Sequence, residues 1–408
     1  MSSRVIVTLI IVIVFILFLE YYTFQAIKNV TKVKSIKWVL LTLSVLIYLN
    51  LFYVIFTTPR SAGQTKEFQW AVGFMLTALI PKLFVFIVLF GEDIVRVIQK
   101  LISYLSAGET ASMPGRRTFI SQIALGLAAL PFIGFLYGVT KGKHNYKVLK
   151  YQLPFKDLPD AFDGFTITHI SDIHSGSFTN AEKIQYGVDM INDQKSDVIL
   201  FTGDLVNNKA DEMDSWISMF SKLEAPMGKY SILGNHDYGD YIDWNSEEDK
   251  KNNFKAVKDV HPKIGFELLC NEHRYLEKEG QKIALVGVEN WGKGFKRAGD
   301  LKLAGDGVNK DDFKILMSHD PSHWELEVKE NNFNYQLTLS GHTHGLQMGI
   351  EIPGWFRWSP SQYVYKQWAG LYEEFGRYIN VNRGFGYHAF PGRVGIWPEI
   401  TVIELKKA

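Results

Sequence analysis

Two histidines one residue apart, His342 and His344, lie between glycines directly after the apolar run at residues 335–339. Side chains two residues apart in an extended chain point to the same face, so both imidazoles can enter one site. Imidazole is the commonest protein ligand for metals, and the flanking Gly341 and Gly345 allow a tight turn beneath a bound ion. The spacing therefore indicates metal binding, although two polar loop histidines would give the same pattern.

Four further clusters of acid, amide and histidine residues each follow an apolar run. They are Asp172 with His174, Asp204 with Asn207, the run Asn235, His236 and Asp237, and His319 with Asp320. A carboxylate after a fully apolar strand, such as Asp204, can bridge two cations because each of its oxygens can bind one. A histidine such as His236 can act as an acid, and the neighbouring Asp237 could orient its imidazole or stabilise the protonated form. We interpret the five clusters as one dinuclear site.

Apolar runs alternate with helix-like stretches throughout the C-terminal two thirds, which is typical of an α/β sheet. Ligands of such sheets collect at the carboxyl ends of strands, where every one of the five clusters is expected to lie. Residues 180–192 are one such helical stretch, with Asn180 as the expected N-terminal cap. The pattern thus predicts an α/β domain with its site at one edge.

Taken in order, the five motifs resemble those of the calcineurin-like metallophosphoesterase family, over roughly residues 165–408. Residues 382–386 and 398–400 look like its membrane-attached bacterial branch of YkuE-type and YaeI-type proteins. The resemblance implies two packed β-sheets flanked by helices, and two divalent metals that are manganese, iron or zinc. It implies that one metal is held by Asp172, His174, Asp204 and His344. It implies that the other is held by Asp204, Asn235, His319 and His342.

The implied chemistry is phosphoester hydrolysis by a metal-activated hydroxide. Two cations about 3.5 to 4 Å apart can orient the attacking oxygen and neutralise the charge of the transition state. His236, with Asp237, would stabilise that charge or protonate the leaving oxygen. Asn207, His388, Arg383 and Arg393 are candidates for binding the substrate, because arginine can grip a phosphate through two hydrogen bonds.

The first third of the chain is strongly apolar and predicts a membrane region. Residues 5–22, 38–56 and 68–90 are long enough to span, and residues 94–105 have the spacing of a surface helix. Residues 113–121, with Arg116 and Arg117, resemble a twin-arginine export signal, and an apolar fourth span follows. We expect a membrane region at 1–110, the twin-arginine-like segment with span four at 111–142, a basic linker at 143–160 and the phosphoesterase-like domain at 161–408.

Charge predicts the orientation of the spans. Four lysines at residues 28–37 lie between spans one and two, against only Arg60 and Lys66 between spans two and three. The positive-inside rule places the first loop inside and the C-terminal domain outside a bacterial cytoplasmic membrane. Four lysines at residues 141–150 argue against that placement. Lys82, near the middle of span three, requires a polar partner or snorkels to the interface.

Composition narrows the classes of function. Lys plus Arg (44) nearly equals Asp plus Glu (43), which gives no argument for nucleic-acid binding. The one cysteine, Cys270, rules out an intrachain disulfide. We expect a membrane-anchored phosphodiesterase or phosphomonoesterase that acts on a lipid-linked or envelope substrate. Trp355, Phe356 and Trp358 could enter the bilayer, hold an acyl chain or pack in the core. The alternatives are a cytoplasmic UDP-2,3-diacylglucosamine hydrolase of lipid A synthesis, a non-catalytic membrane sensor and a secreted-side nucleotidase acting on soluble substrates.

Overall fold

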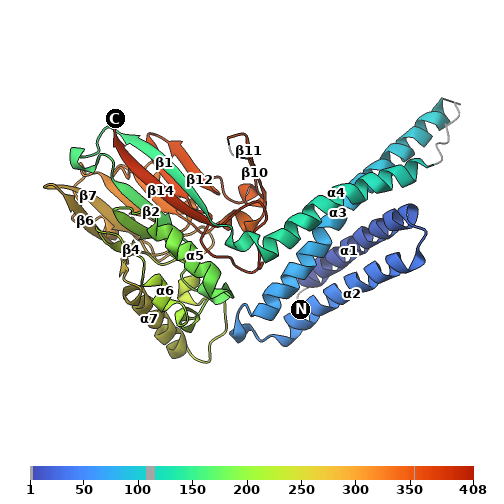
Figure 1. Ribbon diagram of the computed structural model, residues 1–408, viewed down its shortest axis with the longest axis horizontal. Helices are drawn as coiled ribbons and strands as arrows, with labels where there is room; N and C mark the ends of the chain where they lie inside the picture. Colours follow the sequence, from blue (N-terminus) through green and yellow to red (C-terminus); the bar gives the residue numbers. More distant parts are fainter. Residues whose placement is uncertain (1–2, 107–114, 353) are drawn as a thin grey trace. The chain divides into compact units, whose positions relative to one another are not determined.

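The computed structural model describes residues 3–106, 115–352 and 354–408 and divides the chain into two compact units (Figure 1). One unit contains the chain up to residue 58 together with residues 67–137. The other contains residues 59–66 together with 138–408. The short loop at 59–66 is therefore part of the C-terminal unit, although both of its ends continue into the helices of the first unit.

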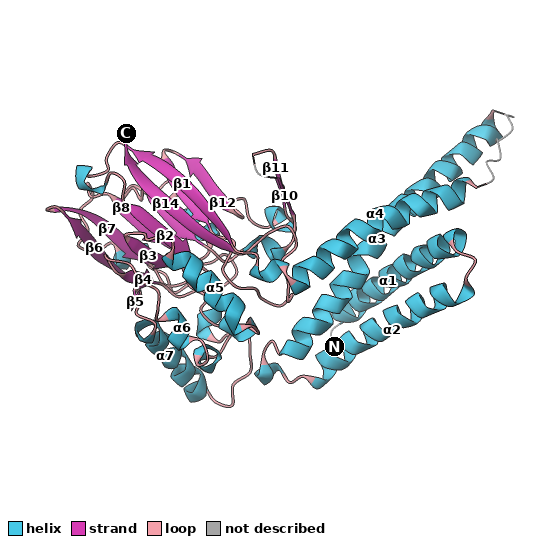
Figure 2. Cartoon of the chain, in the orientation of Figure 1, coloured by secondary structure: helices cyan, strands magenta, loops and turns pink. Residues whose placement is uncertain are grey.

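The first unit consists of four long helices, shown in cyan in Figure 2. They are α1 (Ser3–Val30), α2 (Lys34–Thr57), α3 (Lys66–Leu105) and α4 (Arg116–Thr140). Each of the four is long and apolar enough to cross a membrane. The expectation of about four spans is confirmed.

Helix α3 combines two elements that we predicted as separate helices. The third span and the expected surface helix at 94–105 form one helix of 40 residues, about 60 Å long at 1.5 Å per residue. The junction at residues 91–93 contains Gly91 but no proline, and a single glycine lowers helix propensity without ending the helix.

The twin-arginine-like segment is described only in part, because residues 113 and 114 lie outside the described residues. Arg117 is in the first turn of α4. Its guanidinium pairs with Glu92 and donates to Asp93 Oδ1 (2.8 Å).

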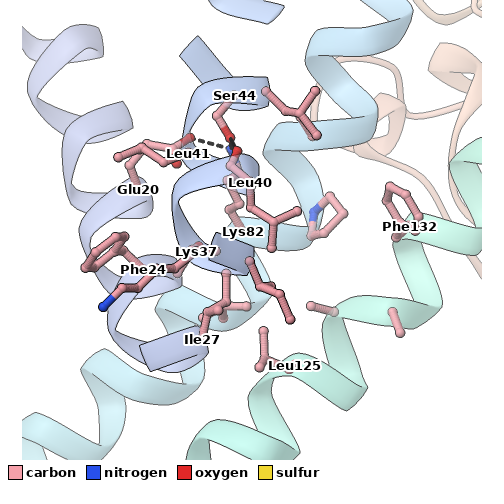
Figure 3. Close-up of a pocket in the computed structure, with 18 of the residues that line it drawn as sticks. Glu20, Phe24, Ile27, Lys37, Leu40, Leu41, Ser44, Lys82, Leu125 and Phe132 are labelled. Carbon is pink, nitrogen blue, oxygen red and sulfur yellow. Dashed lines mark hydrogen bonds and ion pairs between the residues drawn. The ribbon is translucent and has the colours of Figure 1, made fainter. Parts of the chain in front are cut away.

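Lys82 has the polar partner that its depth in the membrane segment required. Its ammonium group pairs with Glu20 of α1 and donates to the Ser44 hydroxyl of α2 (2.6 Å), as Figure 3 shows. These groups line one part of a cavity of about 600 Å³ among the four helices. The rest of the cavity wall is mainly apolar, with Phe24 and Phe132 among its residues. The ion pair thus satisfies two charges that would otherwise be unpaired in an apolar bundle.

The second unit contains two six-stranded sheets. The first has the order β1 (Lys147–Phe155), β14 (Glu399–Lys407), β2 (Thr166–Ile170), β3 (Val198–Phe201), β4 (Lys229–Ser231), β5 (Glu267–Leu268). The second has the order β12 (Gly370–Glu374), β13 (Arg377–Val381), β9 (Leu337–Ser340), β8 (Lys314–Met317), β7 (Gln281–Gly287), β6 (Glu272–Lys278). A separate hairpin pairs β10 (Ile350–Ile352) with β11 (Phe356–Trp358). The helices are α5 (Ala181–Asn192), α6 (Ile217–Phe220), α7 (Glu247–Lys263), α8 (Leu301–Ala304) and α9 (Pro321–His323).

Alternate residues of the central strands bury against different layers. In β3, Val198 and Leu200 enter the core between the two sheets. Ile199 and Phe201 enter the core that also contains side chains of α5 and α7, which cover the outer face of the first sheet (Figure 1). A strand buried on both faces is apolar at every position, which explains its unbroken apolar sequence. The predicted pair of packed sheets flanked by helices is confirmed.

The stretch at 143–160, expected to be a basic linker, contains a strand. Strand β1 pairs in parallel with β14 along all nine of its residues, from Lys147 opposite Glu399 to Phe155 opposite Lys407. Its two lysines are exposed, whereas Leu153 and Phe155 are buried in the core between the sheets. The basic residues dominated the sequence pattern because β1 is an edge strand, where charged side chains are common.

The Glu20–Lys82 pair yields a test of the helical unit. Lys82→Met or Glu20→Gln alone should lower stability by about 3–5 kcal/mol, because each leaves one buried charge or polar group without its partner. The double variant Glu20→Leu/Lys82→Met should recover most of the loss. The measurement is the temperature at which detergent-solubilised full-length protein loses its monodisperse gel-filtration peak, with the exposed Lys28→Met as control. Equal stability of the two single variants and the wild type would contradict the role of the pair.

Candidate metal centre

The five motifs lie just beyond the carboxyl ends of parallel strands. Asp172 and Asp204 follow β2 and β3 of the first sheet, and His319 and His342 follow β8 and β9 of the second. Asn235 follows β4, which is parallel to β3. Because parallel strands end at the same edge, the topology brings all of these side chains to one place. The placement predicted from the sequence is therefore the one that the structure has.

Two groups of side chains at this edge can each hold an ion. In the first, Asp172, His174 and His344 have ligand atoms within 4.8 Å of one another, and His344 Nε2 lies 3.2 Å from Asp172 Oδ1. In the second, Asp204, His319 and His342 have ligand atoms within the same limit. Asn235 Oδ1 lies 2.8 Å from His342 Nδ1, so the amide oxygen faces the second group. The structure thus brings together all seven predicted ligands.

One oxygen of Asp204 faces both groups. Its Oδ2 lies 3.5 Å from His174 Nε2 and 3.2 Å from His319 Nε2. Its Oδ1 accepts a hydrogen bond from the backbone N–H of His236 (2.8 Å). Oδ1 is thus held by the backbone, and Oδ2 is the oxygen that could contact ions in both groups.

The donor set fits divalent ions. His319 Nε2 and His344 Nε2 are buried, and neither makes a hydrogen bond although a carboxylate lies nearby. His319 Nδ1 donates to the carbonyl oxygen of Thr202 (2.7 Å), which leaves Nε2 with the lone pair that a metal requires. Mixed imidazole, carboxylate and amide ligands without thiolate suit manganese, iron or zinc.

The backbone at the site is strained. Five of the seven predicted ligands have positive φ angles, although none is glycine. They are Asp172 (53°), His174 (48°), Asp204 (59°), His342 (71°) and His344 (50°). Such left-handed conformations are uncommon outside glycine and cluster at functional sites, where surrounding structure imposes them. The surrounding structure therefore imposes unfavourable backbone angles on these residues, and the result is the placement of their side chains around the site.

Two glycines allow the motifs to approach. A Cβ atom on Gly341 would overlap Ser171 Oγ and Asp172 Oδ2, and one on Gly234 would overlap Asp204 Oδ1. The bare backbone of residues 341–342 can therefore reach Asp172, whose carboxylate accepts the N–H of His342 (3.0 Å to Oδ2). At these two positions glycine is required because any side chain would prevent the close approach of the backbone to Asp172 and Asp204.

Charges at the site control one another. Burial alone would raise the pKa of Asp172, but His344 and His319 bring it below its ordinary value. Burial likewise opposes ionisation of Asp204, and His319 and His236 lower its pKa to about 2. For His319, burial lowers the pKa while Asp204 and Asp172 raise it to about 10, so an ion that binds there must displace the proton of Nε2. Both carboxylates are thus held in the ionised form that binds cations.

The comparisons with known proteins agree with this geometry. Residues 165–346 match the family model "Calcineurin-like phosphoesterase", and residues 3–143 match "Probable Calcineurin-like phosphoesterase, transmembrane domain". The chain is 30% identical to "Uncharacterized metallophosphoesterase YkuE" of Bacillus subtilis over 298 residues, covering 71% of this chain and 97% of that protein. The chain belongs to the calcineurin-like metallophosphoesterase family. The resemblance seen in the motifs is confirmed.

Two further relatives are phosphoesterases by name, and one of them is also named as a transmembrane protein. "Transmembrane protein with metallophosphoesterase domain" of Danio rerio is 27% identical over 373 residues, which cover 88% of this chain and 77% of that protein. "Phosphodiesterase YaeI" of Escherichia coli is 25% identical over 302 residues, which cover 72% of this chain and all of that protein. The chain is a membrane protein with a metallophosphoesterase domain.

His236 and Asp237 have different surroundings in the phosphoesterase domain. His236 Nδ1 lies 2.8 Å from the carbonyl oxygen of Asn207, to which it donates, and its ring lies 5.0 Å from that of His174. Asp237 does not hold His236 as the sequence suggested. Its carboxylate accepts backbone N–H groups of Asp204 (3.0 Å), Leu205 (2.9 Å) and Gly234 (2.8 Å). Asp237 therefore fixes the loops that carry the ligands.

The four predicted substrate residues divide into two pairs. Asn207 Oδ1 lies 3.2 Å from His174 Nδ1 and 3.3 Å from His388 Nδ1, so Asn207 and His388 are at the centre. Arg383 and Arg393 are buried and bind the protein itself, contrary to the expected phosphate contact. Arg383 pairs with Glu399 and Glu351 (2.6 Å to the latter). Arg393 donates to the carbonyl oxygens of Arg383 (2.7 Å) and His344 (3.2 Å).

Three residues near the ligands were not expected from the sequence. Tyr365 has its hydroxyl 2.7 Å from His342 Nε2. Tyr241 accepts a hydrogen bond from Asn235 Nδ2 (2.7 Å), which turns the amide oxygen of Asn235 toward His342. Gln64 contacts His388 Nε2 at 2.7 Å. None of them lies within a motif, and no sequence signal marked them.

Arg393 yields a test of ligand positioning. Arg393→Gln should weaken binding at the Asp172–His174–His344 group by roughly 10–100-fold, because the backbone of the ligand His344 loses the guanidinium that binds its carbonyl oxygen (3.2 Å). The measurement is competition of full-length protein with a fluorescent chelator for manganese or zinc. Arg377→Gln is the matched control, since Arg377 also donates to backbone carbonyls, those of Val328 (3.0 Å) and Lys329 (2.7 Å), but touches no ligand. An equal loss in both variants would mean that Arg393 acts through general stability.

Proposed function

We propose that this protein hydrolyses phosphoesters at a dinuclear metal centre formed by the seven ligand residues. The observation that carries the proposal is the position of Asp204 Oδ2, which faces both ligand groups. Two divalent ions there would supply Lewis-acid stabilisation of the phosphoryl charge and a strongly acidified water. Manganese, iron and zinc are the candidates. The strained ligand backbone supports the same reading over a non-catalytic sensor.

His236 is the proposed acid or charge-stabilising group. Its Nδ1 hydrogen bond to the Asn207 carbonyl leaves Nε2 to face a substrate. A protonated imidazole at that position can stabilise charge on a phosphoryl oxygen or give its Nε2 proton to the leaving oxygen. Asn207 positions both this ring, through its carbonyl, and His174, through its side chain. Asp237 contributes indirectly, by holding the loop of Asp204.

We propose a lipid-linked substrate. Support comes from the apolar hairpin, which we define as residues 346–364 and which includes β10 and β11. Trp355 is 81% exposed and Tyr363 is 77% exposed, so they do not pack in the core. The hairpin lies in sequence between the ligand His344 and Tyr365, which contacts the ligand His342. An exposed aromatic surface so close to the ligands fits an acyl chain or a bilayer surface.

We infer that the domain lies outside the cytoplasmic membrane of a bacterium. The loop at 59–66 and the phosphoesterase domain form one compact unit, and two candidate spans, α3 and α4, lie between them in the chain. Two crossings return the chain to the side on which it started, which agrees with the loop charges. UDP-2,3-diacylglucosamine would require the opposite orientation and stays the alternative substrate.

Asp204→Asn tests the dinuclear assignment. The substitution should lower kcat on an aryl phosphoester by at least about 100-fold, because the metals supply several kcal/mol and about 1.4 kcal/mol corresponds to a factor of ten. Metal content, measured by mass spectrometry, should fall as well. The exposed Asp211→Asn is the control. Undiminished turnover by Asp204→Asn would refute the assignment.

Trp355→Ser combined with Tyr363→Ser tests the lipid proposal. Hydrolysis of a phospholipid ester in vesicles should fall several-fold, while hydrolysis of a soluble aryl phosphoester should stay unchanged. Phe375→Ser is the matched control, because Phe375 is an aromatic residue 69% exposed in the β12–β13 turn. Equal losses on soluble and vesicle substrates would assign the hairpin to folding. No loss on either would remove it from substrate binding.

A further inference from the structure

The loop between the second and third membrane helices reaches the wall of the metal centre. The loop, residues 59–66, belongs to the same compact unit as the phosphoesterase domain. Arg60 pairs with Asp243 (3.5 Å), and a Cβ on Gly63 would lie 3.1 Å from Ile242 Cγ2 and 3.3 Å from Asn208 Nδ2. The loop therefore packs closely on the domain beside the turn that carries Asn207.

Gln64 binds the 388–389 turn through both ends of its side-chain amide. Its Oε1 accepts the backbone N–H of Ala389 (2.9 Å), and its Nε2 lies 2.7 Å from His388 Nε2. Ala389 has a φ of 58°, an uncommon conformation for alanine, so this turn needs an outside partner. Because Oε1 faces a donor, the amide nitrogen must be the group that donates to His388.

This hydrogen bond defines the proton on His388. With Nε2 accepting from Gln64, the neutral ring carries its proton on Nδ1, which faces Asn207 Oδ1 at 3.3 Å. The same Asn207 oxygen lies 3.2 Å from His174 Nδ1. A continuous chain of hydrogen bonds thus runs from Gln64 through His388 and Asn207 to a metal ligand.

His388 is within reach of the reacting groups. Its ring centroid lies 4.2 Å from that of His236 and 4.6 Å from that of His174. Nitrogen atoms of these three rings lie within 4.8 Å of one another and could themselves gather around an ion. Because Gln64 donates to His388 Nε2, the lone pair of that nitrogen is not available to bind an ion, and the ring is held beside the loop at 59–66.

We propose that Gln64 is a positioning residue of the metal centre, through which the loop between two membrane helices orients His388 beside His236 and His174. The proposal deepens the proposed function and rests on it. It means that the loop at 59–66, although it connects two candidate spans, contributes a side chain to the phosphoesterase site.

The experiment is a double-mutant cycle in full-length protein loaded with manganese, assayed on a soluble aryl phosphoester. Gln64→Met keeps the length of the side chain and removes its hydrogen bonds, and should lower kcat by roughly tenfold. In a His388→Ala background the same change should have a much smaller effect, because only the bond from the Ala389 N–H is then lost. Gln64→Glu keeps the acceptor for Ala389 and loses the donor to His388, so it should lose activity as Gln64→Met does. Arg60→Ala, on the same loop, is the control.

A second measurement does not depend on turnover. Diethyl pyrocarbonate attacks an unprotonated imidazole nitrogen, so modification of His388, measured by peptide mass spectrometry without metals, should rise several-fold in Gln64→Met and not in Arg60→Ala. Unchanged modification, or an undiminished loss of kcat in the His388→Ala background, would overturn the proposal. A wild-type protein that binds metals but hydrolyses nothing would overturn the proposed function, and the modification of His388 would still decide the role of Gln64.

Discussion

The arrangement of the site depends on one carboxylate oxygen that is shared by two sets of ligands. Asp204 follows a strand of the first sheet, whereas His319, 3.2 Å from its Oδ2, follows a strand of the second. The distance between these atoms is therefore set by the packing of the two sheets, which are joined by an apolar core. Close-packed interiors have few voids and low compressibility, so they resist changes in such a distance. The core between the sheets thus serves the metal centre as well as stability.

Conformational strain is concentrated where this precision is needed. Each left-handed residue costs of order 1–3 kcal/mol, and five ligands are in that conformation. Buried contacts compensate: Asp237 accepts backbone N–H groups from the Asp204 loop, and Arg393 donates to the carbonyl oxygens of Arg383 and His344. Buried charged groups with several hydrogen bonds can impose such backbone angles. Residues that looked catalytic or substrate-binding in the sequence are thus part of the support.

The sequence predicted what depends on local pattern. Apolar runs ending in Asp172 and Asp204 specified strands and ligands, because chain order and residue type are enough to locate strand ends. It did not predict what depends on packing. Arg383 is charged and near a motif, yet it is buried against Glu399, and only the fold brings these residues together. Gln64 lies more than three hundred positions from His388, so no local pattern could join them.

The lysines at residues 141–150 argued against placing the domain outside the membrane, and the fold reduces their weight. Lys143 is buried, with its ammonium group 4.9 Å from the centre of the Tyr387 ring. Lys147 and Lys150 belong to β1 and pair with β14. The positive-inside rule counts charges in short flexible loops beside a span, and residues of a folded domain contribute little to it. With these three lysines assigned to the domain, the lysine-rich first loop at 28–37 is the dominant charge signal, and the proposed placement of the domain outside the membrane rests on that loop.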